Sequence, residues 1–208
     1  MKSPKRSFFK TAATIQKPLV KIATATDETP TVDVLVRAFR SDPVIRWVWP
    51  DLQSYLTYFP SFVEVFGGKA FAQKSAYFVE DYAGASLWLP PNTYPDEEAL
   101  FNFLQCTVSK QRQTDLFTVF EQIDRYHPSE PHWYLPLIGI DPSQQSRGYG
   151  SALIRQALIQ CDRTQTLAYL EASSQKSTAF YQRHGFELLG TIQVGTSPPL
   201  FPMQRQPQ

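Results

Sequence analysis

The stretch that decides the fold spans residues 145–151 and reads Gln-Ser-Arg-Gly-Tyr-Gly-Ser. It follows an apolar run and opens a segment with helical spacing. A helix start presents unpaired N–H groups and the positive end of the helix dipole, so Gly148 and Gly150 would let a phosphate group approach closely. Leu153 stands where a dinucleotide-binding loop has its third glycine, and no Gly-Lys-Ser/Thr follows as in a P-loop. Two such glycines are also typical of an ordinary tight turn. The neighbouring segments are therefore needed to distinguish a phosphate-binding turn from an ordinary one.

The segments on either side of this turn predict a β-α-β unit. Residues 132–140, His-Trp-Tyr-Leu-Pro-Leu-Ile-Gly-Ile, form an apolar run typical of a buried strand. Pro136 and Gly139 lie inside it and predict a bulge or a close backbone approach. Residues 148–161 predict a helix, and residues 167–172 predict a further strand. A mixed sheet covered by helices follows from this order.

The rest of the chain alternates between helical and strand-like patterns. Asp42-Pro43 is expected to end the first helix, and Pro60 is expected to break or kink the second. Helices are predicted at residues 27–39, 54–66, 96–106, 113–125 and 177–184. Strands are predicted at residues 19–25, 76–79, 85–89, 186–194 and 200–205. The expected architecture is a single α/β domain over residues 19–208.

Composition narrows the class of protein. The 208 residues are 42% hydrophobic and 14% aromatic, which argues against intrinsic disorder. Twenty Lys and Arg against 19 Asp and Glu leave a net charge of +1, so no nucleic-acid partner is expected. Residues 1–26 nevertheless carry six basic residues and no acid. They predict a flexible basic arm over residues 1–18, for which a targeting or membrane-surface role stays open.

Cysteine usage indicates the compartment. Cys106 and Cys161 lie far apart, form no Cys-x-x-Cys pair and have no histidine at ligand spacing, which argues against a disulfide scaffold and a zinc site. Two buried free thiols suit a reducing compartment, so the cytoplasm is the expected location. No apolar run is long enough for a transmembrane helix. A homodimer is possible.

Two motifs together point to a family. Gln-x-x-Gly-x-Gly follows a strand that ends in Gly-Ile-Asp-Pro, and residues 180–186 read Phe-Tyr-Gln-Arg-His-Gly-Phe. In this order and at this spacing they resemble the GNAT superfamily of acetyl-CoA-dependent N-acetyltransferases, over about residues 132–190. Residues 127–135, with Leu-Glu-Ala-Ser at 170–173, look like the puromycin acetyltransferase branch. The resemblance implies a single-domain GNAT fold with acetyl-CoA as cosubstrate and no metal.

The resemblance also implies which residues contact CoA. The strand expected to pair with the pantetheine arm contributes Ile138, Gly139 and Ile140. The turn whose backbone N–H groups are expected to hold the pyrophosphate comprises Gln145, Ser146, Arg147, Gly148, Tyr149, Gly150 and Ser151. Ser174 stands where many members have asparagine and Gln145 where arginine is commoner, so the CoA contact of Ser174 is left open.

Two residues are candidates for catalysis. Tyr181 matches the family tyrosine near the thioester sulfur, where a phenol that is protonated at neutral pH can donate to the departing thiolate. Glu171 is a charge on a predicted strand. It is the base that accepts the amine's proton, a solvated strand end, or the partner of a lysine. His184, beside Gly185, is expected to be a cation at a helix C-terminus, and His132, at the start of a predicted strand, is not expected to contact substrate.

Aromatic residues suggest the acceptor. Residues 47–66 hold two tryptophans, two tyrosines and three phenylalanines, most of them core by their helical spacing. Some of them, and Trp88, are expected to line an apolar pocket that favours a bulky small-molecule amine. The predicted function is acetyl transfer to such a primary amine by direct attack in a ternary complex. The alternatives are a non-catalytic acyl-CoA-binding regulatory module and a membrane- or RNA-binding protein that uses the basic arm.

Overall fold

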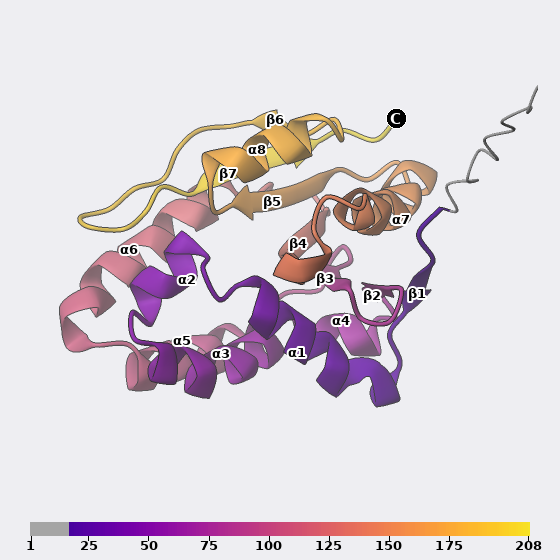
Figure 1. Cartoon of the computed structure of the whole chain (residues 1–208). Coiled ribbons are helices and arrows are strands. Elements are labelled where there is room, and N and C mark those ends of the chain that lie inside the picture. The colour runs from indigo at the N-terminus through magenta and orange to yellow at the C-terminus, as the bar shows by residue number, and fades with distance from the viewer. Residues whose placement is uncertain (1–16) are drawn as a thin grey trace, which may run out of the picture.

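The computed structural model describes residues 17–208 of the chain (Figure 1). All but the last two residues of the predicted basic arm lie outside this range. The helices are η1 (Ala25–Asp27), α1 (Glu28–Ala38), α2 (Pro43–Val48), α3 (Leu52–Gly67), α4 (Lys69–Ala72), α5 (Glu97–Thr107), α6 (Lys110–Tyr126), η2 (Pro142–Gln144), α7 (Tyr149–Arg163) and α8 (Gln175–Gln182). The strands are β1 (Val20–Ile22), β2 (Ala76–Val79), β3 (Gly84–Leu89), β4 (Trp133–Ile140), β5 (Ala168–Ala172), β6 (Glu187–Leu188) and β7 (Phe201–Arg205).

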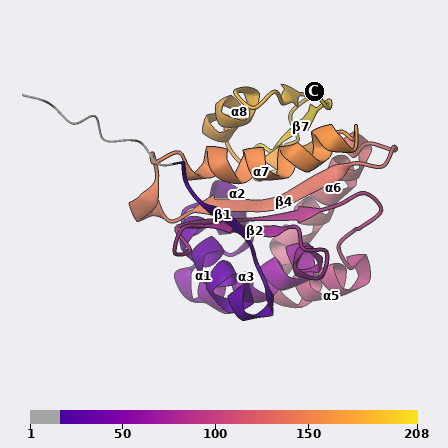
Figure 2. The same cartoon turned by 90° about the vertical axis from the view of Figure 1, so that its right-hand side faces the viewer.

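The strands form one mixed sheet in the order β1-β2-β3-β4-β5-β7-β6. β4 and β5 run parallel, and α7 connects them, which confirms the predicted β-α-β unit. The other pairs in this sheet are antiparallel. Figure 2 shows α7 and α8 on one side of the sheet and α1, α3 and α5 on the other. The α/β mixed sheet covered by helices is therefore as expected.

Each face of the sheet buries its own apolar cluster. Val34, Leu35, Tyr55 and Phe59 are fully buried between α1, α3 and the sheet. On the other face, a second cluster packs α7 against β2, β3 and β5 and contains Leu153, Ile154, Ala157, Cys161, Tyr77, Trp88 and Leu170. Burial of this much apolar surface is the main stabilising contribution for a domain of this size. Within residues 17–208, no helix combines the length and apolar character needed to cross a membrane.

Pro60 and Pro43 do not affect the helices as the sequence predicted. Pro60 lies inside α3 without ending it. Its missing N–H leaves the carbonyl of Leu56 without a helical partner, and Leu56 is exposed, so water can satisfy that oxygen. Asp42-Pro43 ends the first helix but also starts α2, which the sequence did not reveal. Asp42 caps α2 by accepting from the N–H groups of Val44 and Ile45, with Pro43 as its first residue.

Two further predictions were wrong. The strand expected at residues 186–194 is reduced to Glu187–Leu188, followed by an isolated bridge between Ile192 and Leu200. Of the two thiols expected to be buried, Cys161 is buried and Cys106 is exposed. Cys106 lies on α5 beyond its apolar stripe of Leu100 and Leu104. Burial raises the pKa of Cys161 to about 12, so this thiol stays protonated.

Candidate active site

The site begins where β4 and β5 separate. The two strands pair only at Trp133 with Ala168 and at Tyr134 with Tyr169. Just beyond this pairing, β4 has one residue more than β3 between two successive strand pairs, Leu87 with Leu137 and Leu89 with Tyr134. The extra residue forms a β-bulge in β4, and the bulge contains Pro136. Proline cannot donate to a sheet ladder, which explains why the strand yields there. A cavity of about 1240 Å³ opens between the diverging strands. The predicted bulge is confirmed.

The free edge of β4 forms one wall of this cavity. Ile138, Gly139 and Ile140 line it and pair with β3 on their opposite edge. Their other edge has no strand partner in the described part of the chain, so its N–H and C=O groups are available to an extended polar ligand. Gly139 also meets α1 closely, because a Cβ there would lie 2.5 Å from the Cβ of Ala38. The edge fits the predicted contact with a pantetheine arm.

The turn after β4 forms the next wall. Gly148 caps α7 with φ +81°, a left-handed conformation that favours glycine, and a Cβ there would meet nothing within 4 Å. The space in front of the first N–H groups of α7 is therefore open to a ligand. Of the predicted turn residues, the cavity lining includes Gln145, Ser146, Gly148, Tyr149, Gly150 and Ser151, whereas Arg147 is exposed outside it.

Gly150 is needed for packing. A Cβ on Gly150 would approach the ring of Phe180 to 3.3 Å, so its absence lets α7 and α8 lie close together. Lys176 and Arg183, on α8 and directly after it, line the same cavity as the turn before α7. Two cations beside a helix N-terminus provide a suitable environment for phosphate groups. The residues present therefore fit the diphosphate of CoA.

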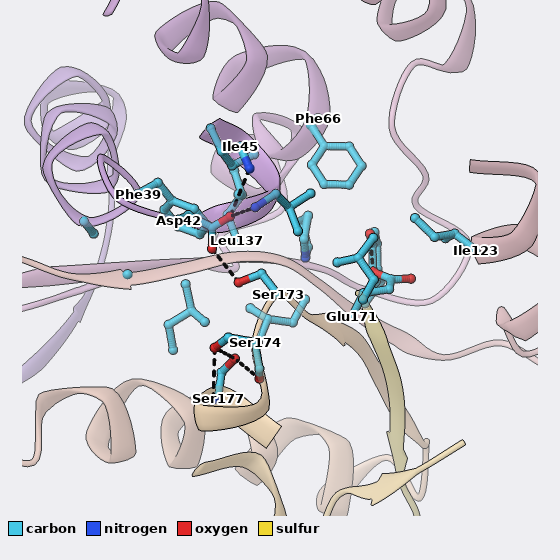
Figure 3. Close-up of a pocket in the computed structure, with 18 of the residues that line it drawn as sticks. Phe39, Asp42, Ile45, Phe66, Ile123, Leu137, Glu171, Ser173, Ser174 and Ser177 are labelled. Carbon is cyan, nitrogen blue, oxygen red and sulfur yellow. Dashed lines mark hydrogen bonds between the residues drawn. The ribbon is translucent and has the colours of Figure 1, made fainter. Parts of the chain in front are cut away.

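Ser174 has a structural role at the start of α8. Its hydroxyl accepts from the N–H of Ser177 at 3.2 Å and lies 2.8 Å from the Ser177 hydroxyl (Figure 3). Ser174 is therefore the N-cap of α8, and it also lines the cavity. Its contact with CoA stays a prediction.

Tyr181 lies on α8 and reaches the cavity from one side. Burial raises the pKa of its phenol, and the nearby Asp42 carboxylate raises it further. Its hydroxyl makes no hydrogen bond to any residue of the range 17–208. Tyr181 thus keeps its proton at neutral pH and has that proton free to donate.

Glu171 lies on β5 and faces the same cavity, in the region of Ile123 and Phe66 (Figure 3). Its side chain is 8% exposed, so it is not a solvated strand end. The Tyr134 hydroxyl donates to its Oε2 at 2.9 Å, whereas Oε1 has no hydrogen-bond partner among the described residues. Burial raises the pKa of Glu171 to about 7, although the bond from Tyr134 opposes this effect. A carboxyl with this pKa can gain and lose a proton at neutral pH.

Sequence reasoning missed Asp42, which also lines the cavity. Its carboxylate accepts from the Ser173 hydroxyl at the end of β5 in addition to capping α2 (Figure 3). Asp42 therefore links the connection between α1 and α2 to the end of β5, across the cavity. Burial raises the pKa of Asp42. The cap signal, an aspartate directly before a proline, was present in the sequence, but the contact with Ser173 depends on tertiary structure.

The histidines differ from expectation. His127 was not proposed as a site residue, yet it lines the cavity, with its Nδ1 3.7 Å from Glu171 Oε1. A histidine at a helix end carries no sequence signal for such a contact. His184 was expected to be a cation, but burial and nearby arginines lower its pKa. Its Nε2 lies 3.0 Å from the Ser151 hydroxyl, so His184 supports the start of α7.

Some of the predicted aromatic residues line the cavity. Trp49, Phe62 and Phe66 do so. Trp88 does not, because it faces the opposite side of the sheet and is buried in the cluster around α7. Side chains alternate along β3, so Trp88 and its neighbours Leu87 and Leu89 face different layers. The prediction that Trp88 forms a pocket wall was wrong.

Comparison with known proteins agrees with this geometry. Residues 115–188, which contain β4, α7, β5 and α8, match the family model of the acetyltransferase (GNAT) domain. Residues 115–188 are therefore a GNAT acetyltransferase domain. A Corynebacterium glutamicum structure described as histone acetyltransferase HPA2 and related acetyltransferase is 27% identical to this GNAT chain, with a TM-score of 0.65. The match covers 92% of this chain and 97% of that one.

Two other relatives extend the comparison. An uncharacterised N-acetyltransferase of Schizosaccharomyces pombe is 27% identical over 146 residues, a match that covers 62% of this GNAT chain and 59% of the relative. The arylalkylamine N-acetyltransferase 2 of Aedes aegypti is 14% identical, with a TM-score of 0.60 and coverage of 93% and 100%. This last likeness concerns the fold alone. The likeness to the puromycin acetyltransferase branch stays a prediction.

Proposed function

We propose that this GNAT protein transfers the acetyl group of acetyl-CoA to a primary amine on an apolar or aromatic small molecule. One observation carries the proposal: a buried carboxyl with a free oxygen, Glu171, shares a cavity with a protonated phenol, Tyr181. Acylation of an amine needs a base for the ammonium and a donor for the departing sulfur. Both groups are present on elements that meet at one cavity.

Apart from the buried carboxyl groups of Asp42 and Glu171, the basic and acidic side chains that line the cavity lie on different elements. Lys176 and Arg183 belong to the α8 side, where the turn before α7 fits phosphates. Acidic side chains on α5 and α6 line the cavity on the other side: Glu97, Glu121 and Asp124. A cleft with one sign of charge attracts ligands of the other sign. This arrangement supports an anionic cosubstrate at one end and a cationic amine at the other.

The acceptor side is otherwise apolar. Its lining consists largely of aromatic and aliphatic side chains from α2, α3, α5 and α6: Val48, Trp49, Phe62, Phe66, Leu100, Phe101, Leu104, Leu116, Phe117 and Phe120. Apolar walls with few convergent polar groups are typical of small-molecule sites. They favour an apolar amine over a highly charged peptide.

The proposed chemistry follows from the positions of these groups. Acetyl-CoA, when bound, supplies a thioester carbonyl that an amine can attack with loss of the thiol. Glu171 takes one proton from the ammonium through Oε1, which leaves the nitrogen lone pair free to attack. Tyr181 donates its proton to the departing sulfur, and the second proton lost by the nitrogen restores the phenol. N–H groups on the free edge of β4 would polarise the carbonyl oxygen.

An assay of thiol release with a panel of amines tests this function. We expect acetyl-CoA to raise the melting temperature and an arylalkylamine or apolar alkylamine to give turnover. A rise in melting temperature with no thiol release from any amine would favour the regulatory-module alternative. Salt-dependent binding to vesicles or RNA that is lost on removal of residues 1–18 would favour the partner-binding alternative. The cytoplasmic location and the homodimer stay predictions.

A further inference from the structure

We propose that His127 carries the proton from Glu171 to solvent during each turnover. The inference rests on the proposed function, because it completes the proton balance of acetyl transfer. An ammonium and a thioester give an amide, a thiol and one free proton. That proton is first held by Glu171, which must release it before the next amine can be deprotonated. The bond from the carboxyl oxygen to the proton breaks, and the imidazole nitrogen accepts the proton and then passes it to water.

Glu171 has few ways to lose its proton. Its side chain is 8% exposed, and the Tyr134 hydroxyl occupies Oε2. The remaining oxygen, Oε1, is itself buried, and the cavity beside Glu171 is the space that CoA and the amine would fill. With both substrates bound, solvent would be excluded from that direction. A lateral route through neighbouring side chains is therefore needed.

His127 provides that lateral route. Its Nδ1 lies 3.7 Å from Glu171 Oε1, slightly beyond hydrogen-bond length, and such contacts often shorten when substrates bind. The His127 side chain is 23% exposed, so the imidazole is accessible to water where Glu171 Oε1 is not. His127 follows the last residue of α6, and its backbone N–H is held by the carbonyls of Ile123 and Asp124. This fixes its place beside β5.

The side chains around His127 favour an imidazole that holds a proton only briefly. Its ring centroid lies 5.3 Å from that of His132, 4.8 Å from that of Tyr134 and 4.5 Å from that of Tyr169. Burial, and to a smaller extent His132, lower the pKa of His127 to about 4, although Asp124 on α6 opposes this effect. The imidazole is therefore neutral at rest and can accept a proton. Protonation by Glu171 is uphill, so the imidazolium is short-lived and discharges to water.

The neighbouring groups are poorer carriers. Burial and the Glu171 carboxylate raise the pKa of Tyr134 and of Tyr169, so neither phenol releases a proton at neutral pH. His132 Nδ1 lies 2.9 Å from the carbonyl oxygen of Glu130, which requires a proton on that nitrogen. His132 has no salt-bridge or hydrogen-bond contact with Glu171 in the described part of the chain. It therefore serves as the matched control.

The test compares His127→Gln and His127→Ala with His132→Gln in the full chain, using the best amine of the panel. We expect kcat to fall roughly tenfold in both His127 variants, less than the loss of a direct acid or base, with the KM for acetyl-CoA unchanged. Imidazole in the buffer should restore His127→Ala, and the loss should shrink as pH rises. The His132→Gln variant should lose less than about twofold and show no rescue.

A second background separates proton transfer from structure. In the Glu171→Gln variant there is no carboxyl group whose proton His127 could accept. Adding His127→Gln to it should therefore cause no further loss of kcat, and imidazole should not restore kcat. Unchanged kcat in a folded His127→Gln variant, or an equal loss in the Glu171→Gln background, would overturn the inference while leaving acetyl transfer intact. No transfer by the wild-type protein to any amine would overturn both.

Discussion

Burial raises the proton affinity of both Glu171 and Tyr181, with opposite consequences for their chemistry. It places the pKa of the carboxyl at about 7, where it can accept a proton from an ammonium. It also keeps the phenol protonated but makes it a weaker acid. Tyr181 is therefore expected to donate a hydrogen bond to the developing thiolate first, and to pass its proton to the sulfur only as the second proton lost by the nitrogen restores the phenol.

Tyr181→Phe tests this role. The substitution keeps the ring and its packing but removes the hydroxyl. Because a thiolate is already a fair leaving group, we expect kcat to fall by about 100-fold, the low end for general acids and bases. The KM for acetyl-CoA should stay nearly constant, since the lost interaction belongs to the transition state. Steady-state kinetics with unchanged turnover would remove Tyr181 from the mechanism.

Glu171→Gln should separate activity from stability. Folded Glu171 binds its proton more tightly than the unfolded chain does, so the free energy of unfolding falls as pH rises from about 4.5 through about 7. Gln carries no charge to bury and can still accept from Tyr134. We expect the variant to melt several degrees above the wild type at pH 8 but not at pH 5.

The same substitution should abolish most turnover, and the loss should be largest just above pH 7, where Glu171 is ionised and the amine still needs deprotonation; it should shrink at lower pH, where Glu171 is protonated, and at higher pH, where the amine is neutral. Wild-type activity should rise with pH through about 7 as Glu171 ionises. Thermal melting and rate profiles over this pH range check both effects. A variant that is less stable than the wild type at pH 8 would contradict the assigned burial of charge.

Individual residues were predictable where their signal was local. Tyr181 was identified by a motif, and Glu171 was noticed because a charge on a buried strand is unusual. His127 could not be found this way, because its contact with Glu171 joins residues 44 positions apart through the docking of α6 on β5. The contact between Asp42 and Ser173 spans 131 positions and has the same origin.

At the scale of elements, the turn between β4 and α7 is the part that we propose binds the diphosphate of CoA. Gly148→Val should abolish the rise in melting temperature that acetyl-CoA causes. A β-branched residue is strained at φ +81° and would project into the open space before α7. Differential scanning fluorimetry with and without acetyl-CoA measures this effect.

Gly148→Asn is the matched control for backbone strain, because asparagine tolerates the left-handed conformation. A loss of the acetyl-CoA effect in both variants would show that the space itself is required. If both variants are folded and keep wild-type affinity, the cradle is misassigned.

Proline predicted the local structure correctly where a missing N–H decides it, and incorrectly where tertiary packing holds a helix together. Pro136 correctly predicted the bulge in β4, because a missing N–H disrupts any sheet ladder. Pro60 did not end α3, since the buried face that holds Tyr55, Phe59 and Phe62 keeps the helix together. Such packing is a property of the whole domain, which explains why local rules missed it.

At the scale of the whole molecule, the mixed sheet followed from the order of patterns along the chain. The cavity did not, because it depends on how far β4 and β5 separate and on how α5 and α6 close over the gap. This is why the sequence indicated an aromatic acceptor pocket but misplaced Trp88. The face of the sheet to which each β3 side chain points was fixed by register.

The most direct test of the account is a competition for acetyl groups. The wild-type protein is given limiting acetyl-CoA with equal concentrations of an arylalkylamine and a lysine-rich peptide, and the acetylated products are quantified by mass spectrometry. The apolar, acid-lined acceptor side of the cavity predicts acetylated arylalkylamine as the main product, with Glu171→Gln forming little of it. Acetylation of the peptide alone, or of neither compound, would contradict the account.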